Sequence, residues 1–292
     1  MKKAFLCSLM LSVVLALWLI NADSVGAEEM KIFKDIEYAV HQGRAMQLDI
    51  YLPSTVEPYP LIVWFHGGAF RMGARTWIEH GALNQINRGY ALASVSYSFS
   101  QTAKWPVQAY QIKAAIRWLR AHAAQYNVDP DKFIAWGMSA GGHLASIAGT
   151  SGDVQSLEDL GLGNSHYSSR VQAVVSWYGP SDFLRMGEWH DDGDSPESEL
   201  VGCPVQTCPE KAARANPVTY ITPDDPPFYI MHGTGDNSVP HSQSLILYDA
   251  LQQAGVTATF ISLTDYAHSD PRFNTGSRIA GVQEFLDSLF MP

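Results

Sequence analysis

Apolar runs and amphipathic segments alternate along the chain from about residue 60 onward. Residues 61–65 read Leu-Ile-Val-Trp-Phe with no polar position, which is typical of a central strand that is buried on both faces. Residues 107–126 instead carry apolar side chains three and four positions apart, the spacing of an amphipathic helix. The alternation predicts an α/β fold with a mostly parallel central sheet and helices on both faces.

The same patterns place the remaining elements. Apolar runs predict further strands at residues 90–95, 132–136, 171–178, 228–232 and 257–263, and helical spacing predicts helices at 76–88, 142–148, 245–254 and 279–290. Near the start of the chain, residues 32–40 and 46–52 flank a His-Gln-Gly-Arg turn and predict an antiparallel hairpin. The pattern contains no internal repeat and no second domain, so we expect one domain over residues 28–292.

Two segments break the alternation. Residues 151–170 are polar and rich in glycine and serine, and residues 182–226 hold many prolines, two cysteines and an acidic run. Loops of this length in a compact domain are usually functional covers or disordered. Ligands of open α/β sheets bind at the carboxyl ends of the strands. We therefore expect both segments to emerge at that edge and to form a small loop cap.

The first 27 residues have the composition of a secretory signal peptide. Two lysines precede an apolar run over residues 4–20, and a polar stretch then ends in Val-Gly-Ala. We expect cleavage after Ala27 and a secreted or periplasmic product. An uncleaved membrane anchor is the alternative, but an apolar run of this length is at the short end for crossing a bilayer.

The net charge limits the classes of partner that we expect, and the cysteines indicate the redox compartment. Removal of residues 1–27 takes away two lysines and one aspartate and leaves a formal net charge of −11. We therefore expect neither nucleic-acid binding nor stable membrane association after cleavage. Cys203 and Cys208 lie five residues apart in a proline-containing loop, which predicts a disulfide in an oxidising compartment. A metal site is the alternative, but two thiols without nearby histidines make a poor zinc shell.

The motif Gly-Met-Ser-Ala-Gly at residues 137–141 carries the most chemical information. It matches G-x-S-x-G and lies between a predicted strand and a predicted helix. A strand-to-helix turn this tight exposes the Ser139 hydroxyl, and the flanking glycines are needed because a Cβ there would collide with a neighbouring strand or helix. The context predicts that Ser139 is a nucleophile.

A serine nucleophile needs a base that removes its proton and an acid that orients the base. In this architecture the acid and then the histidine follow the serine along the chain. Asp236 ends a predicted buried strand at a glycine turn, and His268 lies in a loop after the next strand, so we assign them as acid and base. Asp182 and His241 are the alternatives. Asp182 follows proline and serine in a turn-forming sequence, and His241 lies only five residues after Asp236.

A charged tetrahedral intermediate also needs fixed N–H donors. The sequence His-Gly-Gly-Ala-Phe at residues 66–70 directly follows the first predicted central strand, and its small residues let backbone amides approach a substrate. We expect this loop and the amide of Ala140 to form a two-part oxyanion hole, with His66 in a structural role.

Other residues have less specific interpretations. His143 follows Ser139 by about one helical turn and is expected to pack against the core or to cap the helix. Trp105, Trp177 and Trp189 flank expected loops and are candidates for the wall of an aromatic acyl pocket, although tryptophan is more often a core residue. The sequence has no phosphate loop, metal-ligand cluster or dinucleotide fingerprint.

With these residues in place, the chain resembles α/β-hydrolases of the hormone-sensitive-lipase-like group. Within that group it is similar to the bacterial esterase branch that includes bifunctional acetylxylan and feruloyl esterases. The resemblance covers residues from about 35 to 290. It rests on residues 66–69, 114–120, 137–143, 215–217, 225–228 and 232–240 and on the cysteine loop.

The resemblance implies a cofactor-free esterase that cleaves carboxylic esters, often on plant cell-wall polysaccharide. By motif it implies Ser139 as nucleophile, Asp236 as acid, His268 as base, and the amides of Gly68, Ala69 and Ala140 as oxyanion donors. The sequence departs from the family at two positions. Gln111 stands where relatives often carry aspartate, and Ala69 where many carry a third glycine.

Three other functions share part of this pattern. A prolyl-oligopeptidase-like serine peptidase has the same fold and triad order, but no propeller-sized domain is present in this sequence. A non-catalytic binding protein would be expected to have lost one triad residue. A kynurenine-formamidase-like amidase is a near relative, but export argues against a cytoplasmic catabolic role. The sequence predicts a secreted serine esterase acting on small or polysaccharide-linked esters, and leaves its acyl group, alcohol and oligomeric state open.

Overall fold

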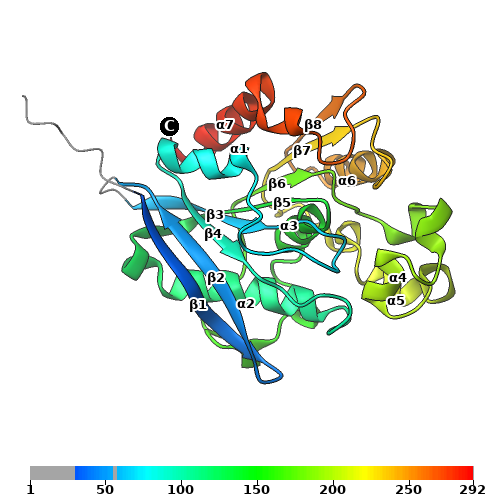
Figure 1. Cartoon of the computed structure of the whole chain (residues 1–292), viewed down its shortest axis with the longest axis horizontal. Helices are drawn as coiled ribbons and strands as arrows, with labels where there is room; N and C mark the ends of the chain where they lie inside the picture. Colours follow the sequence, from blue (N-terminus) through cyan, green and yellow to red (C-terminus); the bar gives the residue numbers. More distant parts are fainter. Residues whose placement is uncertain (1–29, 55–57, 292) are drawn as a thin grey trace, which may run out of the picture.

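The computed structural model of the chain describes residues 30–54 and 58–291 (Figure 1). The expected signal peptide lies outside the described residues. The strands are β1 (Lys31–His41), β2 (Arg44–Leu52), β3 (Tyr59–Phe65), β4 (Ala91–Val95), β5 (Val128–Met138), β6 (Ala173–Trp177), β7 (Phe228–Gly233) and β8 (Ala258–Leu263). The α-helices are α1 (His80–Leu83), α2 (Val107–Ala121), α3 (Ala140–Thr150), α4 (Pro196–Val201), α5 (Pro209–Ala213), α6 (Ser242–Gln253) and α7 (Gly276–Phe290).

All these strands belong to one sheet, in the order β1-β2-β4-β3-β5-β6-β7-β8. The hairpin of β1 and β2 is antiparallel, as expected, and β2 also pairs antiparallel with β4. Every other neighbouring pair is parallel, so β3 to β8 place their carboxyl ends at one edge of the sheet. The predicted α/β fold with a mostly parallel sheet is confirmed.

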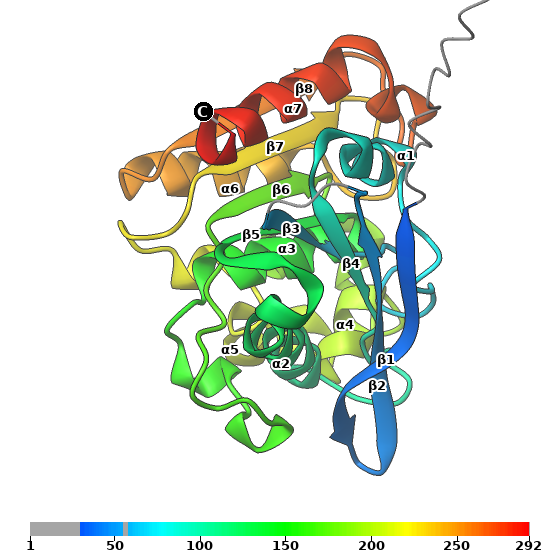
Figure 2. The ribbon, with the colours of Figure 1, turned by 90° about the vertical axis from the view of Figure 1, so that its left-hand side faces the viewer.

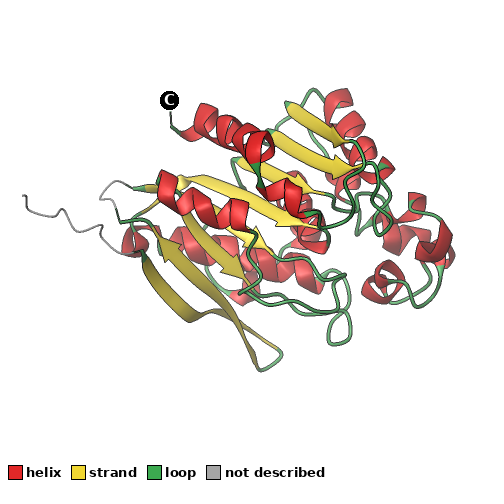
Figure 3. Cartoon of the chain, turned by 45° about the horizontal axis from the view of Figure 1, so that its top comes forward, coloured by secondary structure: helices red, strands yellow, loops and turns green. Residues whose placement is uncertain are grey.

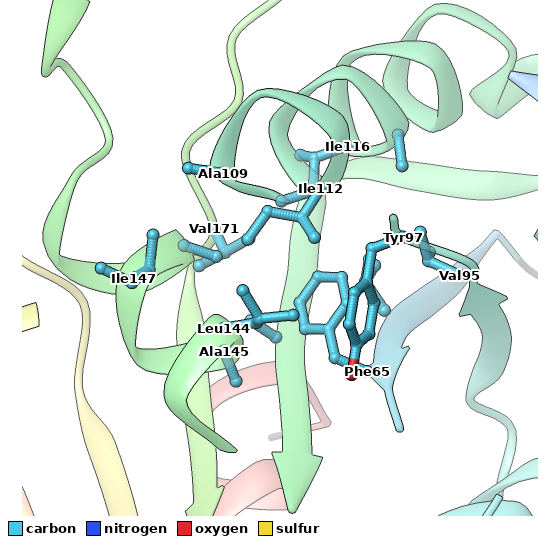
Figure 4. Close-up of a cluster of buried hydrophobic side chains, with 14 of the residues drawn as sticks. Phe65, Val95, Tyr97, Ala109, Ile112, Ile116, Leu144, Ala145, Ile147 and Val171 are labelled. Atoms are coloured by element: carbon cyan, nitrogen blue, oxygen red, sulfur yellow. The ribbon is translucent and has the colours of Figure 1, made fainter. Parts of the chain in front are cut away.

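Helices cover both faces of this sheet (Figures 2 and 3). Helices α2, α3 and α6 pack on one face, where aliphatic side chains such as Ile112 and Leu144 meet Phe65 of β3 (Figure 4). Helices α1 and α7 pack on the other face over an aromatic-rich core that includes Trp64 and Trp136. In the described part of the chain, no helix is long and apolar enough to cross a membrane.

The helix expected at residues 76–88 is much shorter in the structure. Only α1 is α-helical there, and a 3-10 helix over Asn84–Arg88 follows it. Gly81 explains part of the difference, because its N–H donates to Asn274 Oδ1 and an added Cβ would lie 2.5 Å from Ile279 of α7. The conformation of this segment is therefore determined by its contacts with neighbouring elements rather than by its own helix propensity.

The segment at residues 151–170 was expected beside Ser139, and this expectation is wrong. Helix α3 begins after β5 at the carboxyl edge of the sheet and returns the chain to the opposite edge. The segment therefore packs at the amino ends of the strands, where Gln172 N–H donates to Phe133 O at 2.7 Å. Glu158 fixes it to α2 through a buried ion cluster with Lys113 and Arg117.

The segment at residues 182–226 does form a cap. It carries α4 and α5 together with short 3-10 helices before, between and after them. Both α-helices lie beyond the strand ends, at the right of Figure 1. Cys203 and Cys208 are joined by a disulfide within it. The cap is thus a set of short helices rather than an open loop.

Candidate active site

Ser139 occupies the turn between β5 and α3. Its backbone has φ +53° and ψ −124°, an unusual conformation for a residue with a side chain, and its N–H donates to Trp177 O at 2.9 Å. A Cβ on Gly137 would lie 2.1 Å from Gly141 O, and one on Gly141 would lie 1.9 Å from Phe65 O. Both flanking glycines are therefore required by close backbone contact, as the motif predicts.

The structure brings Ser139, His268 and Asp236 together in one hydrogen-bonded line. Ser139 Oγ lies 3.0 Å from His268 Nε2, and His268 Nδ1 lies 2.7 Å from Asp236 Oδ2. The three residues follow β5, β8 and β7, whose carboxyl ends meet at the same edge. In this arrangement the Nδ1–H of His268 donates to the carboxylate, and Nε2 is free to accept the serine proton.

Asp236 is almost completely buried and accepts four hydrogen bonds. Its Oδ1 accepts from the backbone N–H groups of Ser238 (2.8 Å) and Val239 (2.9 Å), and its Oδ2 accepts from His268 and from His232 (3.2 Å). Burial alone would raise the pKa of this carboxyl group, but the donors from His232 and His268 hold the pKa well below its usual range. Asp236 is an anion at neutral pH.

The second histidine on Asp236 was not identified from the sequence. His232 lies in β7 with its side chain fully buried, and its Nε2–H is shared between Asp236 Oδ2 and Val239 O at 3.1 Å. Ser244 of α6 supplies the hydroxyl at 2.7 Å from His232 Nδ1. The only available signal was the spacing of His232 four residues before Asp236 at a strand end.

Gly68 and Ala69 lie in the loop after β3, facing the same space as Ser139. Gly68 has φ +117°, and a Cβ there would lie 2.1 Å from Met72 O, so this position needs glycine. Ala69 has φ +53°, a conformation that glycine adopts more easily than alanine. Ala140 is the first residue of α3, so its N–H has no acceptor within the helix.

His66 holds this loop in place through a hydrogen bond and a ring contact, in agreement with its expected structural role. Its Nδ1 lies 2.7 Å from Gly67 O, and its ring stacks on Tyr97 at a centroid distance of 4.5 Å. Burial lowers the pKa of His66, so the ring is neutral and Nδ1–H donates. Tyr97 also donates its hydroxyl to His66 O at 2.8 Å.

Ser139 opens into a cavity of about 500 Å³. The cap forms one wall with Trp189, His190 and Glu197. His190 and Glu197 are both nearly buried and are joined by a 3.0 Å contact between Nδ1 and Oε2. The remaining lining includes the 67–72 loop, Trp77, Met138, Pro180 and residues 238–239. The volume is within the usual range for small-molecule sites.

Of the three tryptophans considered for this wall, only Trp189 lines it. Trp177 is fully buried in the aromatic core, where its ring lies 5.3 Å from that of Trp136. Trp105 borders a different cavity beside the cap. Trp177 is therefore a core residue, which is the commoner role of tryptophan, and neither Trp177 nor Trp105 lines the catalytic cavity.

The alternative acid and base lie outside the hydrogen-bonded line. Asp182 caps a 3-10 turn, because its Oδ1 accepts from Leu184 N–H at 3.1 Å, and the same oxygen accepts from Asn216 Nδ2 at 2.8 Å. His241 contacts Ser262 Oγ at 2.9 Å. Asp182 therefore has the turn role that its sequence predicts.

His143 and Gln111 have structural roles near the site. His143 is fully buried, stacks on Phe183, and has a pKa lowered to about 4 by burial. This agrees with the predicted packing role. Gln111 is also fully buried, accepts from Ser98 N–H at 2.7 Å, and donates to Ser98 Oγ at 2.8 Å. A neutral amide therefore ties this position to Ser98 by two hydrogen bonds without a charge.

Among the described residues, no cluster of three His, Cys, Asp or Glu side chains could hold a metal ion. The chemistry available at the site is that of Ser139, His268, Asp236 and the backbone amides around them. Such a site can transfer an acyl group to serine and then to water.

Comparisons with known proteins identify esterases that are similar to this chain. Residues 48–251 match the BD-FAE family. The probable carboxylic ester hydrolase LipM of Mycobacterium tuberculosis is 32% identical over 225 residues, which cover 75% of this chain and 51% of LipM. The chain spans between about half and three-fifths of the length of the first curated relatives it matches.

Two solved structures cover nearly the whole fold. A truncated form of a carbohydrate esterase from gut microbiota superposes with a TM-score of 0.81 at 30% identity, covering 90% of this chain and 98% of that one. Esterase 2 of Thermogutta terrifontis, solved with propionate bound, gives a TM-score of 0.72 at 26% identity and covers 91% and 97%. Both are named as esterases, and both share the α/β-hydrolase fold seen here.

Proposed function

The chain belongs to the BD-FAE family of esterases, and from this membership we propose that it is an exported serine esterase that forms an acyl-enzyme. The proposed substrates are acetyl or feruloyl esters of plant cell-wall polysaccharide, or similar small esters. The observation that supports the mechanism best is the unbroken hydrogen-bonded line from Ser139 through His268 to Asp236.

In the proposed acylation step, Ser139 Oγ attacks the ester carbonyl carbon while its proton passes to His268 Nε2. The imidazolium that forms is stabilised by the Asp236 carboxylate, which is already ionised and fixed in place. The amides of Gly68, Ala69 and Ala140 donate to the developing oxyanion. His268 then gives its proton to the leaving alcohol.

In the proposed deacylation step, the same groups act on water. His268 accepts a proton from a water molecule, whose oxygen attacks the acyl carbon. Collapse of the second tetrahedral intermediate returns the proton to Ser139 and releases the carboxylic acid. No cofactor enters either step.

The substrate class rests on the size of the site and on its relatives. A cavity of about 500 Å³ has room for a feruloyl as well as an acetyl group. The solved relatives named above are a carbohydrate esterase and an esterase with propionate bound. Export is supported by the sequence of residues 1–27 and by the disulfide in the cap.

The test compares wild type with Ser139→Ala on aryl acetate, methyl ferulate, acetylated xylan and a prolyl peptide. We expect ester turnover by wild type and a loss of at least about 10⁴-fold in kcat for the variant. Ser238→Ala is a matched control, because Ser238 lines the same cavity but helps Asp236 only through its backbone N–H. Cleavage of the peptide without the esters would overturn the proposal, and inertness toward all four would indicate a non-catalytic protein.

A further inference from the structure

A second cavity lies beside the cap and shares no lining residue with the catalytic cavity. Its volume is about 820 Å³, against about 500 Å³ at Ser139. Its lining residues come from the start of α2, the ends of α4 and α5, and the segment after α3. The proposed mechanism gives this space no role.

The charge of its lining is the opposite of the charge of the protein. Three of its twelve lining residues are cations, namely Lys104, Lys211 and Arg214, and none is Asp or Glu. The whole chain has 29 acidic and 19 basic residues. Within the described part of the chain, none of these three cations forms an ion pair, and all three are exposed. The lining is therefore locally cationic in a protein whose net charge is negative.

Three of the other lining residues are half-buried aromatic side chains that form hydrogen bonds with backbone carbonyl groups. Trp105 Nε1–H and the Tyr220 hydroxyl both donate to Arg214 O, at 2.8 and 2.6 Å. The Tyr110 hydroxyl donates to Ser156 O at 3.4 Å. With their polar atoms occupied by the backbone, these residues offer their rings as fixed, largely apolar walls.

From this combination we propose that the cavity binds an acidic carbohydrate, a pyranose ring that carries a carboxylate (a uronate). The guanidinium of Arg214 can bind a carboxylate with two N–H groups, and the two lysines add point charges. The aromatic rings suit the C–H face of a sugar ring. The volume suits a ligand of one or two rings, and the overall negative charge of the chain disfavours a long polyanion such as nucleic acid.

The two cavities lie on opposite sides of a short series of ring contacts. The Trp105 ring lies 5.8 Å from His143, and His143 lies 5.3 Å from Phe70, which lines the catalytic cavity. The binding site itself does not depend on the esterase proposal.

The test is calorimetric titration of the mature protein with a uronate-substituted xylo-oligosaccharide, with the unsubstituted oligosaccharide of the same length, and with inorganic phosphate. The variant carries Lys104→Gln, Lys211→Gln and Arg214→Gln. A matched control carries Lys31→Gln, Lys34→Gln and Arg44→Gln, three exposed cations of the β1–β2 hairpin that change the net charge equally.

We expect wild type and the control to bind the uronate-bearing ligand at least about tenfold more tightly than the neutral one, a difference of about 1.4 kcal/mol. The cavity variant should lose this preference. Equal binding of both oligosaccharides, or an unchanged preference in the cavity variant, would overturn the proposal. Phosphate binding as tight as uronate binding would also overturn it, because the site would then recognise an anion alone.

Aryl acetate hydrolysis is measured in parallel to separate the two proposals. It should be the same in wild type and in both triple variants, because none of the six residues lines the catalytic cavity. Selective uronate binding by a protein that hydrolyses no ester would support the carbohydrate site while contradicting the esterase. Ester hydrolysis without selective binding would do the reverse.

Discussion

Two buried carboxylates at opposite edges of the sheet, Asp236 and Glu158, are used differently. At the carboxyl edge, Asp236 accepts from two backbone N–H groups and two histidines. At the amino edge, Glu158 lies between Lys113 Nζ at 3.0 Å and the Arg117 guanidinium. Their side chains are similarly buried, with 1% and 8% of the surface exposed.

The difference lies in the charge of the donors. Glu158 forms ion pairs with two cations of α2, and these pairs neutralise its charge and fix the segment after α3 to α2. Asp236 is held by neutral backbone donors and by histidines that carry charge only when protonated. Its negative charge therefore remains available to a cation that forms at His268 during a reaction. Asp236 and Glu158 thus differ in whether their partners are already charged.

The largest expected effect that tests this comparison is that of Asp236→Asn. The amide keeps the shape but no longer stabilises an imidazolium, and it favours the wrong tautomer of His268. We expect kcat for an aryl ester to fall by about 10⁴-fold. Asp182→Asn, at the alternative acid, should leave kcat roughly unchanged. A small loss for Asp236→Asn would mean that another group acts as the acid.

Glu158→Gln should have its effect on stability instead. It leaves Lys113 and Arg117 buried without their counter-ion, and burial already lowers the pKa of Lys113 against the attraction of Glu158. We expect the free energy of unfolding, measured with urea, to fall by about 3–5 kcal/mol. The activity of the folded fraction should not change.

The control for Glu158→Gln is Asp153→Asn, which removes one of the two exposed carboxylates that pair with Arg170 and leaves Asp224 in place. That change should cost less than about 1 kcal/mol. If both variants lost the same amount, the cluster at the amino edge would have no special role in holding the segment.

The sequence was informative wherever one strong local rule applied. Unbroken apolar runs located the central strands, and the glycine spacing around Ser139 located the elbow because backbone collisions allow no other residue there. The order of serine, acid and histidine then selected Asp236 and His268. These features depend on short segments whose neighbours in space are dictated by the fold class.

Features that depend on distant contacts were not predictable in the same way. The edge at which residues 151–170 emerge is decided by the direction of α3, and their own composition says nothing about it. The helix expected at 76–88 is limited by the contact of Gly81 with α7. The role of His232 depends on the register of β7 against the turn that holds Asp236. Each requires a partner far away in the chain or a backbone geometry that a pattern does not encode.

His232→Gln tests how much one of the uncharged donors contributes to the function of Asp236, and its expected effect is smaller than that of Asp236→Asn. It removes one donor from Asp236, and a hydrogen bond to a charged group is worth about 1.5–3 kcal/mol. We expect kcat to fall by about tenfold or somewhat more. We also expect the pH at which kcat is half-maximal to shift, which loss of packing alone would not cause.

Rescue distinguishes positioning from packing at this residue. His232→Asn, whose shorter amide cannot span the same distance, should be less active than His232→Gln if the donor matters. Equal kcat values and an unshifted pH profile in both variants would show that His232 only fills space.

The smallest expected effect is the pH dependence of stability that Asp236 contributes. Folding lowers the pKa of this carboxyl group. Its contribution is therefore fully present above the unfolded value of about 4 and is lost as the pH falls through the lower folded value. The difference in unfolding free energy between wild type and Asp236→Asn should shrink between pH 6 and pH 3, measured with urea. A difference that stays constant or grows on acidification would contradict this sign.

The order of the strands along the chain also sets the order in which the residues of the site are synthesised. Ser139 follows β5 near the middle of the sheet, Asp236 follows β7, and His268 follows β8 at the edge. A growing chain therefore carries the serine well before it carries the two residues that would make that serine reactive. A chain that ends before β8 lacks His268, the base that would activate the Ser139 hydroxyl.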